Sequence, residues 1–151
     1  MTHIRPNPEA RFETLAFIDT FAPDDVDAAL ALLKTTSWAS GLTKDQIKAA
    51  FANSYAVGAR RAGDGRLVGL ARAVTDRATF AYLTDLIVAP EMRKAGLGGA
   101  LIRRLLSADR VRSVQHIALL ASKPSIEALA ADLGFRKTDW QSAWMERLAA
   151  S

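Results

Sequence analysis

The stretch VAPEMRKAGLGGALIRRLL, from Val88 to Leu106, decides the fold of this chain. Of the nine glycines in the whole sequence, three fall within four residues of this stretch, at Gly96, Gly98 and Gly99. They come directly after Arg93 and Lys94 and directly before a helical pattern of leucines. Because a glycine inside a helix costs about 1 kcal/mol relative to alanine, the cluster needs a reason in the backbone or in function.

A junction between a strand and a helix accounts for the cluster. Pro90 cannot donate a hydrogen bond to a sheet, so it ends the preceding strand. The free N–H groups at the start of the next helix, with the positive end of its dipole, form an anion site. Gly96 and Gly98 let the backbone approach a phosphate, and Arg93 and Lys94 add positive charge at its edge. The alternative, that the glycines only allow a helix to pack tightly on a strand, leaves the two basic residues unexplained.

Two well-known phosphate loops do not fit this stretch. The loop of nucleotide triphosphatases needs lysine and then serine or threonine after its last glycine, but Ala100 and Leu101 follow Gly99. The dinucleotide-binding fingerprint needs a glycine three places before Gly96, where Arg93 stands. The anion site therefore belongs to another class.

The chain around this stretch alternates strand and helix patterns without a linker or a repeat. The connections at Asp64–Gly65 and at residues 76–79 are too short for crossovers, so they predict antiparallel pairing of the strands they join. We expect one domain over residues 1–151, with a mixed α/β sheet. The expected strands are 11–21, 54–61, 66–76, 79–89 and 114–121, with a terminal hairpin over 134–140 and 142–149; the expected helices are 25–33, one capped by Thr43 and reaching about Ala52, one from the glycines to about Asp109, and one from Ser122 or Ser125 to Gly134.

Composition excludes several kinds of site. The chain has 151 residues, of which 50% are hydrophobic and 24% charged, as in an ordinary globular protein. It has no cysteine, which excludes disulfides, thiolate nucleophiles and cysteine–zinc sites. Its two histidines, His3 and His116, are far apart, which argues against a metal centre and a serine–histidine triad. No apolar run approaches the about 20 residues that span a membrane, so we expect a cytoplasmic protein without membrane association.

The net charge of +4 is compatible with a polyanionic partner. Nucleic acid is one candidate, and a multiply phosphorylated small molecule is another. The arginines are scattered, however, and no aromatic–basic motif or recognition helix accompanies them. We therefore expect no nucleic-acid partner.

The loop resembles the acetyl-coenzyme A pyrophosphate loop of the GNAT superfamily of N-acetyltransferases. In that family a strand ending in valine–x–proline leads into arginine–x–x–glycine–x–glycine and a helix; here these positions are Val88, Pro90, Arg93, Gly96 and Gly98. The order of elements from about Trp38 to Arg147 and the "LGF" at Leu133–Phe135 extend the resemblance. It implies a GNAT-like fold with a largely antiparallel central sheet flanked by helices.

The resemblance also implies a cosubstrate site for acetyl-coenzyme A, with no metal. The main chain of Leu86, Ile87 and Val88 would contact the pantetheine arm, as a strand edge pairs with a peptide. The pyrophosphate would lie on the loop formed by Arg93, Lys94, Ala95, Gly96, Leu97, Gly98 and Gly99.

The usual proton-transfer residues of the family are missing here. Many members have a tyrosine four residues before the glycine of "LGF" as general acid, and that position is Ala130. The asparagine often found eleven residues before that glycine is Lys123. A carboxylate base is often found four residues before the strand-end valine, and that position is Thr84, which cannot act as a base. The general acid and base therefore stay open.

The remaining candidates are a few residues near the expected site. Tyr82 is a proton relay or a wall of the acceptor pocket, or else a half-buried strand aromatic. Thr84 would lie beside it on the same face, as a further candidate for contact with the acceptor substrate. Strand alternation places Asp85 on the other face, where a buried structural hydrogen bond is favoured over a general base. Trp38 either shapes the acceptor pocket or packs in the core. His116, Trp140 and Trp144 are interpreted as structural.

The sequence thus predicts an acetyl-coenzyme A-dependent N-acetyltransferase that acts on a primary amine of a small molecule or a protein. Direct transfer in a ternary complex is expected, because neither a cysteine nor an activated serine is present as an acyl carrier. The alternative from another class is a non-catalytic acetyl-coenzyme A sensor or partner module. The sequence leaves the acceptor undetermined, and a homodimer stays as open as a monomer.

Overall fold

The computed structural model describes residues 12, 14–139 and 145–147. These residues form two compact units, one up to Leu120 and one from Ala121 onward. The first unit holds strands β1 (Leu15–Ile18), β2 (Tyr55–Arg61), β3 (Leu67–Thr75), β4 (Phe80–Val88) and β5 (His116–Leu119), helices α1 (Pro23–Leu33), α2 (Lys44–Ala52) and α3 (Leu97–Ser107), and short 3₁₀ turns η2 (Ser37–Ala39) and η3 (Pro90–Met92). The second unit holds α4 (Pro124–Asp132).

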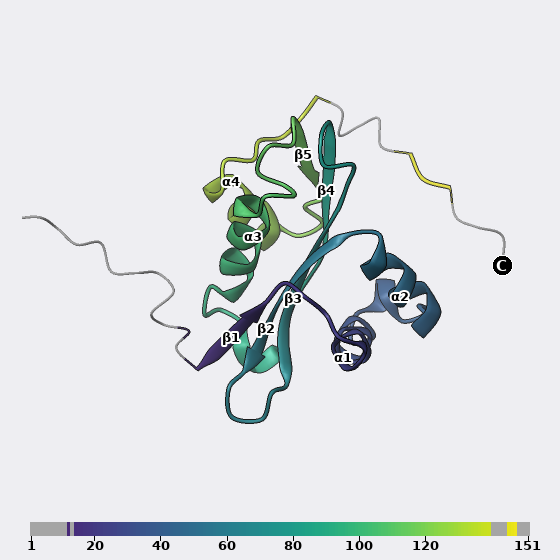
Figure 1. The fold of residues 1–151 in the computed structure, drawn as a ribbon. Helices are drawn as coiled ribbons and strands as arrows, with labels where there is room; N and C mark the ends of the chain where they lie inside the picture. The colour runs from purple at the N-terminus through teal and green to yellow at the C-terminus, as the bar shows by residue number, and fades with distance from the viewer. Residues whose placement is uncertain (1–11, 13, 140–144, 148–151) are drawn as a thin grey trace, which may run out of the picture. The chain divides into compact units, whose positions relative to one another are not determined.

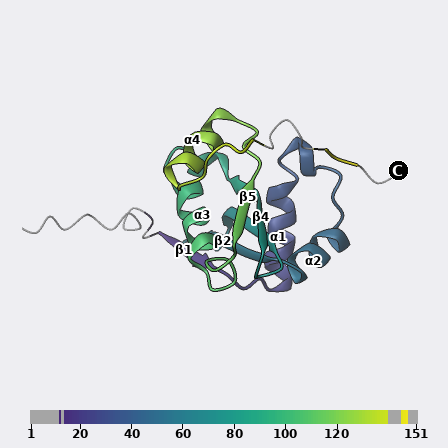
Figure 2. The same ribbon diagram turned by 90° about the horizontal axis from the view of Figure 1, so that it is seen from above.

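The strands form a single sheet in the order β1-β2-β3-β4-β5. The first three pairings are antiparallel, and β4 pairs with β5 in parallel. Helices α1 and α2 cover one face of the sheet, and α3 covers the other (Figures 1 and 2). The predicted mixed α/β sheet, largely antiparallel, is confirmed.

Helix α3 packs closely on β3 because β3 carries a glycine at the contact. The leucine stripe Leu97, Leu101 and Leu105 is fully buried. A Cβ placed on Gly69 would lie 2.9 Å from Cδ1 of Leu101 and 3.1 Å from Cδ2 of Leu97. The missing side chain therefore lets the start of α3, where the glycine-rich loop ends, approach the sheet.

The predicted turns and caps of the first unit are present where the residue types require them. The Thr43 side chain accepts a hydrogen bond from the backbone N–H of Gln46, and Gln46 accepts one from the Thr43 N–H, which closes a capping box. Gly65 has a φ of 69°, as the hairpin turn after Asp64 needs. Asp76 accepts hydrogen bonds from the N–H groups of the next turn, and these bonds and that of the Thr79 hydroxyl, the largest single cause, hold its pKa far below the usual range.

Two predictions for the second unit are wrong where the structure describes them. Helix α4 begins after Lys123, with Pro124 in its first turn and no side-chain cap, because proline's fixed φ suits that position. Neither predicted serine is the N-cap. Residues 135–139 and 145–147 form no strand, since their run of polar residues lacks the apolar alternation that a sheet face needs. The rest of the predicted hairpin, with Trp140 and Trp144, lies outside the described residues.

The C-terminus of α4 follows its prediction. Gly134 has a φ of 88°, and its N–H donates to the carbonyl of Ala131. The N–H of Phe135 donates to the carbonyl of Ala130, which completes a Schellman-type cap. Glycine is required here because the cap residue is left-handed.

The contact at Gly69 generates a stability prediction. Gly69→Val should lower the free energy of unfolding by about 1–3 kcal/mol, because α3 must shift away from β3 to accept the new side chain. Urea unfolding followed by circular dichroism measures this. Gly63→Ala is the control, because nothing lies within 4 Å of its Cβ position. Equal stability of Gly69→Val and the parent chain would show that α3 does not depend on this approach.

Candidate active site

The glycine-rich loop turns from β4 into α3 through two left-handed residues. Arg93 is extended, Lys94 has a φ of 62°, and Gly96 has a φ of 84° and is the N-cap of α3. A left-handed backbone costs a residue with a Cβ roughly 1–2 kcal/mol, so the conformation explains the glycine at position 96. Lys94 carries that strain in the same loop, as residues at functional sites often do.

The first turn of α3 offers its N–H groups to a ligand. A helix leaves its first N–H groups without an intrahelical partner, and Gly96 has no side chain with which to cap them. The residues that follow, Leu97, Gly98 and Gly99, present main chain without a bulky polar side chain. Together with the helix dipole, these groups favour an anion at this position.

Arg93 is tied to the end of β4. Its Nε donates a hydrogen bond of 3.1 Å to the carbonyl oxygen of Val88. Two predicted parts of the site, the strand end and the basic loop, are therefore brought together. Arg93 is otherwise exposed, and the hydrogen bond to Val88 holds its guanidinium in place.

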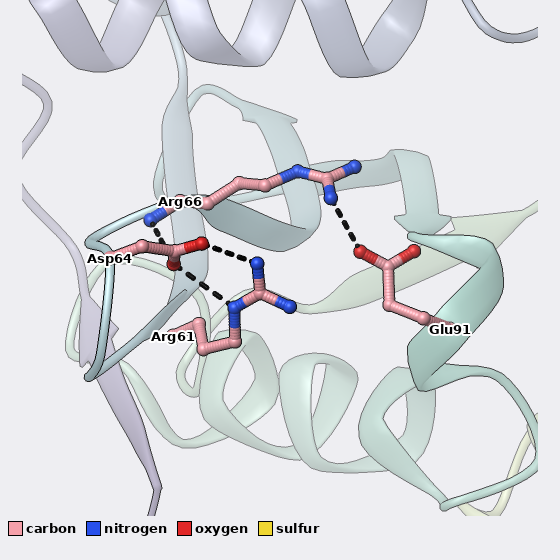
Figure 3. Close-up of polar contacts among 4 residues, drawn as sticks. All are labelled: Arg61, Asp64, Arg66 and Glu91. Carbon is pink, nitrogen blue, oxygen red and sulfur yellow. Dashed lines mark hydrogen bonds and ion pairs between the residues drawn. The ribbon is translucent and has the colours of Figure 1, made fainter.

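An ion pair across the sheet's hairpin end holds the turn that precedes this loop. Arg66, the residue before β3, contacts Glu91 of η3, with 2.8 Å between the guanidinium nitrogen and the carboxylate oxygen (Figure 3). Arg61 binds Asp64 in the same hairpin, and this contact, with the Arg66 N–H, lowers the pKa of Asp64 to about 2. The ion pair of Arg66 with Glu91 also offsets the negative charge of Glu91, two residues before Arg93. Sequence reasoning missed it, because the partners lie 25 residues apart along the chain.

Strand β4 is paired on both sides only in its first half. Phe80 to Leu83 pair with β5, and the ladder ends at Leu83 and Leu119. Beyond this point, within the part of the chain that the structure describes, β4 pairs only with β3. The main chain of Leu86, Ile87 and Val88 thus has one edge without a strand partner, as a peptide-like ligand requires.

A β-bulge lies where the open edge begins. Leu70 pairs with Ile87 and Arg72 pairs with Thr84, so Ala71 alone faces two residues of β4, Asp85 and Leu86. Asp85 has a φ of 55°, a left-handed conformation that aspartate tolerates better than most residues. A bulge of this kind bends its strand and increases the local twist.

The carboxylate of Asp85 is the buried polar centre of this region. Its side chain is 6% exposed, and its Oδ2 lies 2.6 Å from Nε of Arg72. The Thr84 hydroxyl donates to Oδ1 at 3.3 Å. Arg72 also donates to the Ser54 hydroxyl at 3.2 Å. Asp85 is buried and Thr84 is partly exposed, as strand alternation predicted, and the expected structural hydrogen bond of Asp85 is the one with Arg72. The bulge, which was not predicted, lies at this point of the strand.

Tyr82 lies three residues before the bulge, opposite Val74 of β3 and Ala118 of β5. Partial burial, and then the charge of Asp85, raises the pKa of its phenol above the usual value. The phenol therefore remains protonated at neutral pH and can donate a proton or a hydrogen bond. At about 3.3 Å per residue it lies roughly 13 Å along the strand from Leu86.

The other predicted residues lie on separate segments. Trp38 is 60% exposed on η2, between α1 and α2, so the core-packing alternative is wrong. His116 opens β5 with its ring edge-to-face against Phe80, at 5.3 Å between centroids. Ala130 is buried in α4, in the second unit.

The described residues contain no group of three or more potential metal ligands, and no helix among them is long and apolar enough to cross a membrane. Around the loop the polar groups are mainly main-chain N–H groups and the side chains of Arg93 and Lys94, and the carboxylates of Glu91 and Asp85 are each paired with an arginine. This arrangement suits an anionic ligand with an extended, peptide-like part.

Comparison with known proteins identifies the family of the chain that carries these features. Residues 24–135 match the Acetyltransferase (GNAT) family. The chain belongs to this family. GNAT acetyltransferases use acetyl-coenzyme A as cosubstrate, which accords with an anion site beside an open strand edge.

Several relatives and solved structures are similar to this GNAT chain. GCN5-related N-acetyltransferase 2, chloroplastic, of Arabidopsis thaliana is 37% identical over 79 residues, 48% of this chain and 30% of the relative. Histone acetyltransferase TAP1 of Glycine max is 34% identical over 100 residues, 60% of this chain and 43% of the relative. The chain thus spans less than half the length of these two curated relatives.

Among solved structures, a protein of Xanthomonas campestris pv. campestris assigned to the GNAT family has a TM-score of 0.77 and 28% identity, over 89% of this chain and 93% of that one. A Clostridium acetobutylicum structure that contains acetyl-coenzyme A has a TM-score of 0.68 and 17% identity, over 89% and 96% of the two chains. The second likeness concerns the fold alone.

The buried ion pair generates a prediction. Asp85→Asn should lower the free energy of unfolding by about 3–5 kcal/mol, because it leaves the Arg72 charge buried without its counter-charge. Arg72→Met combined with Asp85→Asn should recover part of the loss, since no charge then remains. Chemical unfolding of both variants measures this. Asp109→Asn, which removes an exposed ion pair with Arg112, is the control and should stay within about 0.5 kcal/mol of the parent. A double variant less stable than Asp85→Asn alone would contradict this account.

Proposed function

We propose that this GNAT chain is an N-acetyltransferase that transfers the acetyl group of acetyl-coenzyme A directly to a primary amine. The observation that carries the proposal is the left-handed loop from Arg93 to Gly99 at the end of a strand whose edge is open. The loop suits a diphosphate, and the open strand edge suits an amide-containing arm. Their contiguity along the chain matches a ligand that has both.

The loop residues fit the cosubstrate. The backbone N–H groups of Leu97, Gly98 and Gly99 would hold the pyrophosphate, and Gly96 takes the conformation that aims them. Arg93 and Lys94 add charge, and a charge-assisted hydrogen bond is worth about 1.5–3 kcal/mol. When bound, acetyl-coenzyme A supplies the thioester from which the acetyl group is transferred.

The main chain of β4 would orient the cosubstrate. Leu86 to Val88 lie beyond the bulge, on an edge with no strand partner among the described residues, and their main chain can pair with the pantetheine amides apart from the Val88 carbonyl, which accepts from Arg93. The ion pair between Arg72 and Asp85 fixes the bulge and thereby the direction of this edge. Asp85 has a positioning role in this account, because its carboxylate is engaged by Arg72 and Thr84.

Proton transfer must come from groups other than the family's usual tyrosine. The amine must lose a proton before attack, and the departing sulfur must gain one. Ala130 can supply neither, and Thr84 cannot act as a base. Solvent, the amine itself or a side chain elsewhere in the chain therefore carries the proton. Tyr82 is the phenol on β4, and we place it at the acceptor pocket.

The acceptor would be a small-molecule or protein amine. Trp38 is exposed on the connection between α1 and α2, where an apolar ring is available to contact an acceptor. The soybean relative is named a histone acetyltransferase, which supports a protein amine as one class to test. Acetyl transfer to a panel of amines and lysine peptides tests the activity.

A second function is favoured by one observation, the absence of the usual acid and base at Ala130 and Thr84. A chain that keeps the loop and lacks these groups could bind acetyl-coenzyme A as a sensor without turnover. Saturable binding with no acetyl transfer to any amine of the panel would support this alternative over the enzyme.

The loop generates a binding prediction. Acetyl-coenzyme A at about 100 times its dissociation constant should stabilise the chain by about 2.7 kcal/mol, seen as a rise in melting temperature. Gly96→Val should abolish this rise, because a branched side chain intrudes on the anion site and penalises the left-handed backbone.

Gly65→Val is the matched control for this experiment. Gly65 has a φ of 69° in the hairpin turn, with nothing within 4 Å of its Cβ position. The variant should carry a similar backbone penalty and still bind acetyl-coenzyme A. If folded Gly96→Val binds as well as Gly65→Val, the glycines serve packing only.

Tyr82 generates a kinetic prediction. Tyr82→Phe should raise the KM for the amine more than it lowers kcat, because the phenol lies too far along β4 to reach the thioester sulfur. A positioned general acid is typically worth about 10²–10⁴-fold in rate, so the two roles are well separated. Steady-state kinetics with varied amine measures both. A hundredfold fall in kcat with unchanged KM would identify Tyr82 as the acid.

A further inference from the structure

A cavity of about 580 Å³ lies within the first unit, and no residue of the glycine-rich loop lines it. Its walls come from the connection of β1 to α1, from α2, from the start of β2 and from the segment after α3. Its charged and aromatic lining residues are Asp19, Phe21, Lys48, Phe51, Tyr55 and Arg110. Its volume falls in the range of about 300–1,000 Å³ that small-molecule sites have.

Two measures separate this cavity from the glycine-rich loop. Tyr55 pairs with Ala73, four residues along β3 from Gly69, which pairs with Val88; at about 3.3 Å per residue this is about 13 Å. Arg110 follows the C-terminal end of α3, whose N-terminal end carries the loop. Eleven helical residues span about 16 Å.

The cavity has an aromatic side. Phe21 and Phe51 meet edge-to-face, with 5.0 Å between ring centroids and 70° between planes. Both rings are half-buried, and the buried residues Val26 and Ala56 also line the cavity. This side suits an apolar, planar group.

The cavity also has charges of both signs around one phenol. The guanidinium of Arg110 lies over the Tyr55 ring, 5.7 Å from its centroid. Burial and the neighbouring carboxylate of Asp19 raise the pKa of the Tyr55 phenol, and Arg110 opposes this shift. The phenol is hydrogen-bonded to the Asp19 carboxylate, whereas Arg110 lies over the ring.

These charges are not neutralised by each other. Within the described residues, no ion pair joins Asp19 to Arg110 or to Lys48, and neither cation pairs with another carboxylate. A cationic ligand would pair with Asp19 only, and an anionic ligand would pair with Arg110 and Lys48 only. A zwitterion satisfies both.

We propose that this cavity binds an α-amino acid with an aromatic side chain. The ammonium group would contact Asp19, the carboxylate would contact Arg110 and Lys48, and the ring would lie against Phe21 and Phe51. The cavity lies apart from the glycine-rich loop, and the proposal stands whether or not the chain is an enzyme.

The test is isothermal titration calorimetry of the full chain with three probes. L-Phenylalanine should bind saturably, whereas 3-phenylpropionate, which lacks the ammonium group, and phenethylamine, which lacks the carboxylate, should each bind at least about tenfold more weakly. No saturable binding of L-phenylalanine, or equal affinity for either singly charged probe, would overturn the proposal.

Variants locate the binding. Arg110→Ala should weaken L-phenylalanine and 3-phenylpropionate by about tenfold or more, and Asp19→Asn should weaken L-phenylalanine without weakening 3-phenylpropionate. Arg112→Ala is the matched control, since it removes an exposed arginine two residues away and should leave binding unchanged. All three positions are exposed, so melting curves should show intact folding.

Two further results would contradict the proposed location. One is unchanged L-phenylalanine affinity in both Arg110→Ala and Asp19→Asn. The other is loss of L-phenylalanine binding in Gly96→Val, which would place the probe at the glycine-rich loop instead.

Discussion

Asp85 occupies the register slip between β3 and β4, and its buried carboxylate is held by the guanidinium of Arg72 at 2.6 Å. A buried carboxylate needs this partner, because an unpaired charge in the interior would cost several kcal/mol. The pair in turn holds the left-handed turn of the backbone at position 85. Because a bulge bends its strand, the direction of β4 beyond Asp85, and with it the open edge and the loop, depends on this contact.

The glycine-rich loop is supported from both of its ends. On one side Arg93 is anchored to the last carbonyl of β4, and on the other α3 rests against β3 at Gly69. The ion pair of Arg66 with Glu91 adds a tie to the hairpin and offsets a charge that an anion would otherwise meet. The N–H groups of the first turn of α3 are therefore fixed before any ligand arrives, which lowers the entropic cost of binding.

Local patterns predicted most of the fold. Thr43, Asp64–Gly65 and Gly96 each have a local backbone role, so sequence alone located these turns and the starts of two helices. The unpredicted features depend on contacts between distant residues. Nothing in the sequence near Arg72 indicates that its partner is Asp85, 13 residues further on. The bulge at Asp85 is likewise not visible in the alternating pattern of β4. The exposure of Trp38 was likewise undetermined, because a tryptophan between two helices suits the core and the surface equally. The cavity at Tyr55 combines four segments and has no motif.

The half-paired state of β4 also bears on how molecules of this protein behave toward one another. An open strand edge is a template for any extended chain, including the same segment of a second copy. Two features of the edge limit such pairing: the left-handed turn at Asp85 interrupts its line, and Arg93 occupies the carbonyl of Val88 with a charged side chain. The residues that shape the site therefore also protect the empty protein from aggregation through β4. A ligand paired along this edge would occupy its main-chain groups directly and so give the bound protein the same protection.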